Sequence, residues 1–146
     1  MALKLLVLMF MEKTLKIHEC MTLVPRTIGG DIPVSKAGQI MRELDIRHLP
    51  VLYEGKLVGI VSDRDLKIAK SFRGPGELNV EDVMSPDPFV VSPEAFLDDV
   101  AAEMVAHKFG SAVVQAGSGK VVGIFTTIDA LRVLQDTFRK YYSHAA

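Results

Sequence analysis

Residues 55–65 read GKLVGIVSDRD, and residues 119–129 read GKVVGIFTTID. Each stretch is an apolar segment followed by a hydroxyl residue, two further residues and an aspartate, which gives Ser62 with Asp65 and Thr126 with Asp129. Self-similarity of this kind predicts a fold built from two copies of one supersecondary unit. Any pocket formed by one copy should therefore have a counterpart formed by the other.

The repeat extends on both sides of these stretches. Methionines recur in the same register, Met21 with Met84 and Met41 with Met104, and one residue is inserted in the second turn at 116–119. Turns accept insertions at little cost. We therefore expect an apolar N-terminal lead (1–17), a first repeat (18–72), a linker rich in glycine and proline (73–78), a second repeat (79–135) and a C-terminal tail (136–146).

The composition is that of a globular protein, with 49% hydrophobic and 24% charged residues in a chain of 146. One repeat of roughly 60 residues would bury too little surface to be more than marginally stable alone. A net charge of −1 gives no general attraction to nucleic acid or to anionic membranes. The single cysteine, Cys20, cannot form an internal disulfide, as is typical of a reducing compartment. We expect a cytoplasmic protein that binds neither nucleic acid nor a membrane.

Residues 1–10 are strongly apolar for the start of a chain. A membrane-spanning helix needs about 20 apolar residues, so this segment is too short. A secretory signal is disfavoured because no small-residue cleavage site follows before Glu12 and Lys13. The segment remains open to three interpretations: an extra strand, a contact for a partner, or a leader upstream of a true start at Met11.

The apolar pattern alternates between strand and helix within each copy. The predicted α/β (α+β) fold has two β-α-β-β-α repeats packed with pseudo-two-fold symmetry. We expect Asp31 to cap the first helix, and Ser92 followed by Pro93 to start the corresponding helix of the second copy. The predicted elements are short strands at 26–28 and 89–91, helices around 37–44 and 97–105, hairpins over 49–61 and 112–125, and a closing helix after each hairpin.

The segment Ile46-Arg47-His48-Leu49-Pro50-Val51, followed by Gly59 to Asp65 and matched by a second copy in register, resembles a tandem CBS domain pair, or Bateman module. It is similar to stand-alone prokaryotic members grouped with acetoin-utilisation proteins. The resemblance implies a regulatory, non-catalytic module, usually a homodimer, that acts on an unknown regulated protein. It also implies an adenosine-containing ligand (AMP, ADP, ATP or S-adenosylmethionine) and no other required cofactor.

Asp65 and Asp129 have two possible roles. The spacing from Ser62 and Thr126 is that of a capping box, in which the hydroxyl and carboxylate satisfy backbone donors at the start of a helix. The resemblance implies a second role, in which each carboxylate accepts hydrogen bonds from ribose hydroxyls.

The resemblance further implies two clefts, each assembled from both copies. Arg47, His48 and Arg64 would contact phosphate, with a solvated surface position as the alternative for the arginines. Ile46 and Phe109 would enclose adenine, and a core role is the alternative for both. The second copy has Gly110 and Ser111 in place of Arg47 and His48, so the clefts should be unequal. One cleft combines Ser62, Arg64 and Asp65 with Ser85, Val90, Phe109 and Ser111; the other combines Thr126 and Asp129 with Thr22, Thr27, Ile46, Arg47, His48 and Pro50.

Other functions have less support in the sequence. An enzyme needs a nucleophile with a base or a pair of acids, and no such constellation is present, so we expect no catalytic residue. His18 and Cys20 are too few ligands for a tetrahedral metal site. The alternative function is an interaction or dimerisation module whose clefts no longer bind nucleotide. The amphipathic segment 129–138 would then pack on a second subunit, or it simply completes the core.

Overall fold

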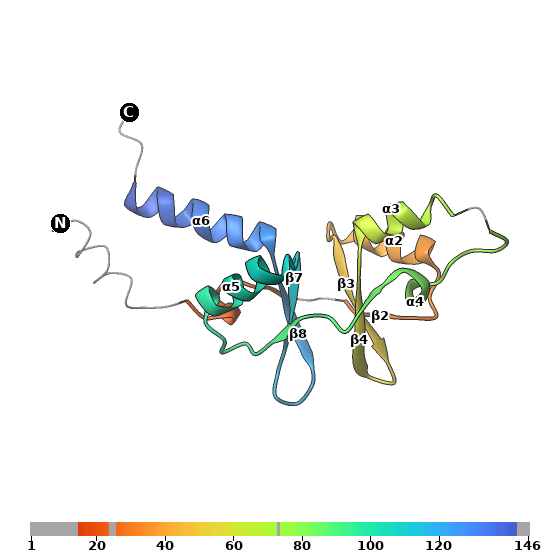
Figure 1. Ribbon diagram of the computed structural model, residues 1–146, viewed down its shortest axis with the longest axis horizontal. Coiled ribbons are helices and arrows are strands. Elements are labelled where there is room, and N and C mark those ends of the chain that lie inside the picture. Colours follow the sequence, from red (N-terminus) through yellow and green to blue (C-terminus); the bar gives the residue numbers. More distant parts are fainter. Residues whose placement is uncertain (1–14, 24–25, 73, 143–146) are drawn as a thin grey trace. The chain divides into compact units, whose positions relative to one another are not determined.

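The computed structural model describes residues 15–23, 26–72 and 74–142, which form two compact units (Figure 1). Of the described residues, unit 1 contains 15–23, 90–117 and 122–142. Unit 2 contains the described residues 26–72 and 74–89 and the hairpin tip Ser118–Val121. The apolar residues 1–10 and Met11 lie outside the described residues, so their role stays a prediction.

Unit 2 is a four-stranded sheet in the order β2-β3-β4-β5 with helices packed on it. β2 runs parallel to β3, whereas β3, β4 and β5 are antiparallel to their neighbours. The β3–β4 hairpin turns at Glu54 and Gly55, which both have positive φ angles. The elements are β2 (Ile28–Gly29), α2 (Val34–Glu43), β3 (His48–Tyr53), β4 (Lys56–Ser62), α3 (Asp63–Ala69), α4 (Val80–Val83) and β5 (Ser85–Pro86).

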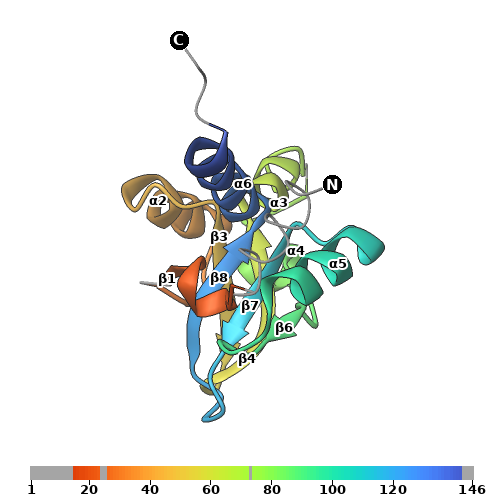
Figure 2. The same ribbon diagram turned by 90° about the vertical axis from the view of Figure 1, so that its left-hand side faces the viewer.

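Unit 1 repeats this plan with a sheet in the order β1-β8-β7-β6, visible side by side in Figure 2. β6 runs parallel to β7, and β1 is antiparallel to β8. The closing helix α6 extends through Tyr141, into residues that the sequence places in the tail. The elements are the 3-10 turn η1 (Ile17–Glu19), β1 (Thr22–Leu23), β6 (Val90–Val91), α5 (Leu97–His107), β7 (Ser111–Gln115), β8 (Val121–Thr126) and α6 (Thr127–Tyr141).

Each sheet ends in a short strand that belongs, in sequence, to the other repeat. β1 precedes the rest of the first repeat but pairs with β8, with Thr22 opposite Ile124. β5 opens the second repeat but pairs with β4, with Ser85 opposite Ile60. The β-α-β-β-α order lacks these two strands because a two-residue strand is too short to show an alternating pattern.

We call β1 and β5 the exchanged strands, and glycine is required where β5 approaches β4 and where β1 approaches β8. A Cβ atom on Gly59 would lie 3.0 Å from the Ser85 carbonyl oxygen, and one on Gly123 would lie 3.0 Å from the Thr22 carbonyl oxygen. Each would also collide with the side chain of the methionine that precedes the exchanged strand. The glycine in both GKxVGI stretches therefore permits a close backbone contact.

Buried side chains fill the space between each sheet and its helices, as the apolar periodicity predicts. In unit 2, Ala37 and Met41 of α2 pack with Leu49 and Val51 of β3. Unit 1 buries Val100 and Met104 of α5, the β7 residues 112–114, and Ile124 and Phe125 of β8. Phe125 is fully buried, directly before the residues that begin α6.

Both predicted helix starts are wrong. α2 begins at Val34 after Pro33, and Asp31 does not cap it. α5 begins at Leu97, several residues after Ser92, whose hydroxyl accepts a hydrogen bond from the backbone of Glu94 instead. The turn between them is tied by main-chain bonds to residues 15–18, including His18 N to Pro93 O at 3.0 Å. This tertiary contact overrides the local capping signal.

Candidate functional site

The first candidate site lies where β4 ends and α3 begins in unit 2. Ser62 caps the helix, and Asp65 completes the capping box. Asp65 Oδ2 accepts hydrogen bonds from Ser62 N at 2.8 Å and from Ser62 Oγ at 2.7 Å, while Asp65 N donates to Ser62 Oγ at 3.2 Å. The capping role is thus confirmed. Among the described residues no group donates to the other carboxylate oxygen, Oδ1, so that acceptor is open.

The start of β3 lies beside this capped turn. His48 is opposite Ser62 in the antiparallel register, and Asp63 N donates to the Arg47 carbonyl at 2.9 Å. A hydrogen bond from Lys67 lowers the pKa of Asp63, and the charge of Arg47 adds a smaller effect in the same direction. Cationic side chains thus stand close to the first turn of α3.

The remaining predicted site residues of unit 2 are spread over several elements. Ile46 is partly buried and packs against the buried cluster, and its contact with adenine stays a prediction. Pro50 is buried within β3. Thr27, Arg64 and Ser85 are exposed: Thr27 directly before β2, Arg64 on α3, and Ser85 in β5.

The second candidate site repeats the capped turn in unit 1. Asp129 Oδ2 accepts from Thr126 N at 2.8 Å and from Thr126 Oγ1 at 3.0 Å. Here Oδ1 is also engaged, by Thr22 Oγ1 at 2.8 Å and by Arg132 Nη1 at 3.1 Å. A carboxylate offers about four acceptor positions, and all are filled. Asp129 is 3% exposed and links β1, β8 and α6.

Arg132 is the functional candidate that sequence reasoning missed. It lies three residues after Asp129 on α6, a spacing at which side chains on a helix meet. This spacing after an aspartate was the readable signal. The corresponding position of the first repeat holds Ile68, which is 65% exposed and cannot pair with a carboxylate.

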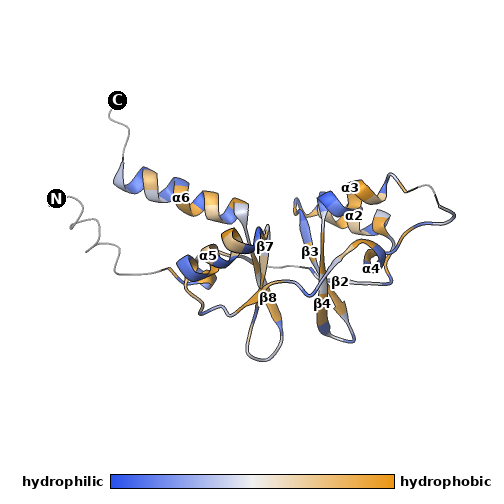
Figure 3. Cartoon of the chain, in the orientation of Figure 1, coloured by the Kyte–Doolittle hydropathy of each residue, from blue (hydrophilic) through white to orange (hydrophobic). Residues whose placement is uncertain are grey.

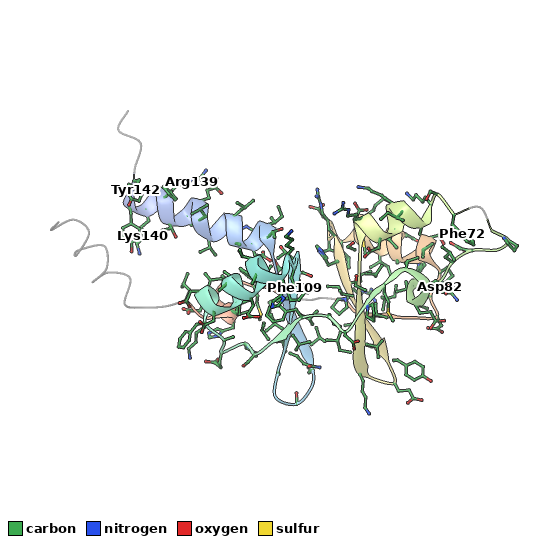
Figure 4. All side chains as sticks on the ribbon, in the orientation of Figure 1. Phe72, Asp82, Phe109, Arg139, Lys140 and Tyr142 are labelled. Carbon is green, nitrogen blue, oxygen red and sulfur yellow. The ribbon has the colours of Figure 1, made fainter. Side chains whose placement is uncertain are left out.

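The other predicted residues of unit 1 lie around the start of β7 and in β6. Thr127 N donates to the Gly110 carbonyl at 3.2 Å, repeating the bond from Asp63 to Arg47, and Ser111 begins β7. Phe109, labelled in Figure 4, stacks on His107 with ring centroids 5.3 Å apart. It lines a largely apolar hollow of about 380 Å³ with residues including Met104 and Phe125. Val90 is exposed in β6.

Each predicted cleft combines residues of unit 1 with residues of unit 2. Thr22 does meet Thr126 and Asp129, as the second set requires, and all three belong to unit 1. Ser62, Asp65 and Ser85 all belong to unit 2. The pairing of each group with residues of the other unit stays a prediction.

Cys20 does not have the features of a reactive or metal-binding thiolate. Its Sγ donates to the Lys16 and Ile17 carbonyls. Burial raises the pKa of the Cys20 thiol, and the nearby charge of Asp129 raises it further, so the thiol is protonated at neutral pH. Within residues 15–23, 26–72 and 74–142, no three His, Cys, Asp or Glu side chains are grouped so that they could hold a metal ion. In the same ranges no helix has the length and apolar character of a membrane span.

Residues 17–71 and 80–136 match the family described as CBS domain. The chain therefore belongs to the CBS domain family, as two tandem copies. The resemblance to a tandem CBS pair is thus confirmed, and so is the mixed α/β (α+β) fold class.

Solved structures of similar proteins cover nearly the whole chain. An acetoin utilisation protein, AcuB, from Vibrio cholerae is 33% identical with a TM-score of 0.73, over 87% of this chain and 95% of that one. The CBS domain pair of protein MJ0100, solved with 5′-methylthioadenosine and S-adenosyl-L-methionine, is 25% identical with a TM-score of 0.77, over 86% and 99%. CBSX2 from Arabidopsis thaliana, solved with AMP, is 28% identical with a TM-score of 0.68, over 85% and 98%.

Relatives that are named as enzymes are much longer than this chain. Inosine-5′-monophosphate dehydrogenase of Korarchaeum cryptofilum is 36% identical over 103 residues, which are 70% of this chain and 21% of that protein. The chain thus spans about a fifth of the length of this relative.

Proposed function

We propose that this chain is a regulatory, non-catalytic module of the cytoplasm that binds an adenosine-containing ligand such as AMP, ADP, ATP or S-adenosylmethionine. The open Oδ1 of Asp65 is the observation that carries the proposal, because it is a fixed acceptor at a helix start. The ligands in the MJ0100 and CBSX2 structures all contain adenosine, and their ribose carries two neighbouring hydroxyls.

The capped aspartate suits such a diol. Its Oδ2 is held by Ser62, so the orientation of the carboxylate is set before a ligand arrives. Hydrogen bonds to a charged group contribute about 1.5–3 kcal/mol each. Arg47, His48 and Arg64 are the proposed phosphate contacts, and Phe109 is a proposed wall for adenine.

The proposed mechanism is a shift of populations. A ligand held by residues of both units binds one relative arrangement of the units, or one oligomeric state, more tightly than others. A separate regulated protein then recognises the favoured state. Binding alone performs the regulation, and no bond of the ligand is broken.

Calorimetric titration with AMP, ADP, ATP and S-adenosylmethionine tests the proposal directly. We expect saturable heat with at least one of them, and none with guanosine monophosphate as the control for the base. A well-folded sample that gives no heat with any of the four would contradict nucleotide sensing and support the interaction-only function.

We also propose that the chain forms a homodimer through α6. Leu131, Leu134, Phe138 and Tyr141 are each between 49% and 58% exposed and follow one another at helical spacing along one face. Figure 3 shows the alternation of apolar and polar residues along this helix. An exposed apolar face of this kind is typical of a protein interface. The same observation supports the alternative function of an interaction module.

A Leu134→Glu variant is expected to convert the dimer to a monomer in light scattering at micromolar concentration, because it places a charge in the centre of the apolar face. Arg139→Glu introduces the same residue on α6 outside the apolar face (Arg139 is labelled in Figure 4) and should leave the dimer intact. A wild-type protein that is monomeric, or equal dissociation of both variants, would rule out α6 as the interface.

A further inference from the structure

Arg132 covers the carboxylate of Asp129 in unit 1. Its Nη1 donates to Asp129 Oδ1 at 3.1 Å, next to the Thr22 hydroxyl at 2.8 Å. Asp129 is 3% exposed, whereas the Arg132 side chain is 60% exposed. Of the two donors on Oδ1, the arginine is therefore the one on a long side chain mostly in solvent, and it can leave without disturbing packed residues.

We propose that Arg132 makes the Asp129 site selective for phosphorylated ligands. The guanidinium occupies the acceptor position that a ribose hydroxyl needs, so a ligand must displace it. A displaced guanidinium recovers a charged partner only when the ligand carries an anion, and phosphate matches its forked donors well. This inference rests on the proposed function, because it requires ribose to bind at Asp129.

The surroundings of Arg132 leave room for this exchange. A hollow of about 380 Å³ adjoins the side chain and is lined by Ile128, Leu131, Arg132 and Gln135. The neighbours lining the hollow are apolar or neutral, so a guanidinium that turns into the hollow finds no carboxylate there. In the described part of the chain Arg132 is ion-paired with Asp129 and not with Asp136. Once a ribose hydroxyl has displaced the Arg132 guanidinium from Asp129, the guanidinium is unpaired, and the phosphate of the same ligand can pair with it.

The Asp65 site has no counterpart of Arg132. Ile68 stands where the second repeat has Arg132, and no described group donates to Asp65 Oδ1. A nucleoside therefore displaces no counter-ion there. We expect the Asp65 site to accept adenosine more readily than the Asp129 site does, and the Asp129 site to accept AMP in strong preference to adenosine.

An Asp65→Asn background isolates the Asp129 site for calorimetry with AMP and adenosine. In this background we expect AMP to bind and adenosine to bind at least about tenfold more weakly. Adding Arg132→Ala should strengthen adenosine binding and weaken AMP binding, so that the preference falls by about tenfold or more. A gain of adenosine affinity is a result that a purely structural role for Arg132 would not produce.

Arg139→Ala is the matched control, since it removes the same charge from the same helix at a position without a contact to Asp129 (Figure 4). It should leave the preference unchanged, and thermal melts should show that all variants fold. The inference is overturned if Arg132→Ala leaves the preference unchanged or weakens both ligands equally. It is also overturned if Asp65→Asn abolishes AMP binding. Failure of the wild-type chain to bind any adenosine-containing ligand would instead overturn the proposed function itself.

Discussion

An Asp65→Asn variant is expected to weaken AMP binding at its own site by about tenfold or more, because a hydrogen bond to a charged acceptor is lost. Asparagine retains one carbonyl oxygen, which the Ser62 cap uses. Its amide group then faces the ribose as a donor and cannot accept from the hydroxyls. The fitted number of AMP sites per chain in calorimetry should accordingly fall from two to one.

Asp82→Asn provides a control with the same chemistry. Asp82 (labelled in Figure 4) accepts from Asn79 N at 2.8 Å through Oδ2 at the start of α4, which repeats the backbone bond from Ser62 N to Asp65 in the same unit. It should lose some stability but no affinity for AMP. If Asp65→Asn binds AMP like the wild type, or if both variants lose affinity equally, Asp65 is a capping residue and no more.

A Phe125→Ala variant is expected to lower the free energy of unfolding by about 3–5 kcal/mol, since it removes a fully buried aromatic side chain. Small domains are stable by only about 5–15 kcal/mol, so this loss is a large fraction of the total. Phe125 also immediately precedes Thr126, and the turn that orients Asp129 should loosen with the strand.

Chemical denaturation followed by circular dichroism measures this loss. Tyr53→Ala is the control, because Tyr53 is also aromatic but 66% exposed at the β3–β4 hairpin, and its removal should cost little. Equal midpoints for the two variants would show that Phe125 is not part of a packed core. A loss in Phe125→Ala alone would confirm the burial on which unit 1 depends.

The order of long elements could be predicted from the sequence because their apolar periods are distinct. The helices α2 and α5 follow from residues such as Met41 and Met104 recurring on one face, and both hairpins follow from pairs of short apolar runs joined by a turn. The predicted start of α5 at Ser92 and Pro93 was wrong, since Leu97 N is bonded to the carbonyl of Leu15, far away in the sequence. Local propensity contains no information about such a contact.

In the candidate site, too, local patterns could be predicted from the sequence and long-range contacts could not. The caps of Asp65 and Asp129 follow from a hydroxyl residue three positions earlier, which is a local pattern. Whether the second carboxylate oxygen is open or occupied is not local, because Thr22 reaches Asp129 across 107 residues. Arg132 was within reach of sequence reasoning by its spacing, but its contact with Oδ1 depends on the side chain turning back along α6.

The exchanged strands β1 and β5 make each repeat depend on the other for a complete sheet. A first repeat made alone would contain Thr22 without Asp129, and a second repeat made alone would contain Asp129 without Thr22. Neither half encodes a complete sheet, since β5 completes the sheet of β4 and β1 that of β8. A single copy would thus need a second identical chain to exchange strands with, whereas the two copies joined in one chain exchange them within it. Two copies in one chain can also differ in sequence, and they do so here, because the second copy has Arg132 where the first has Ile68.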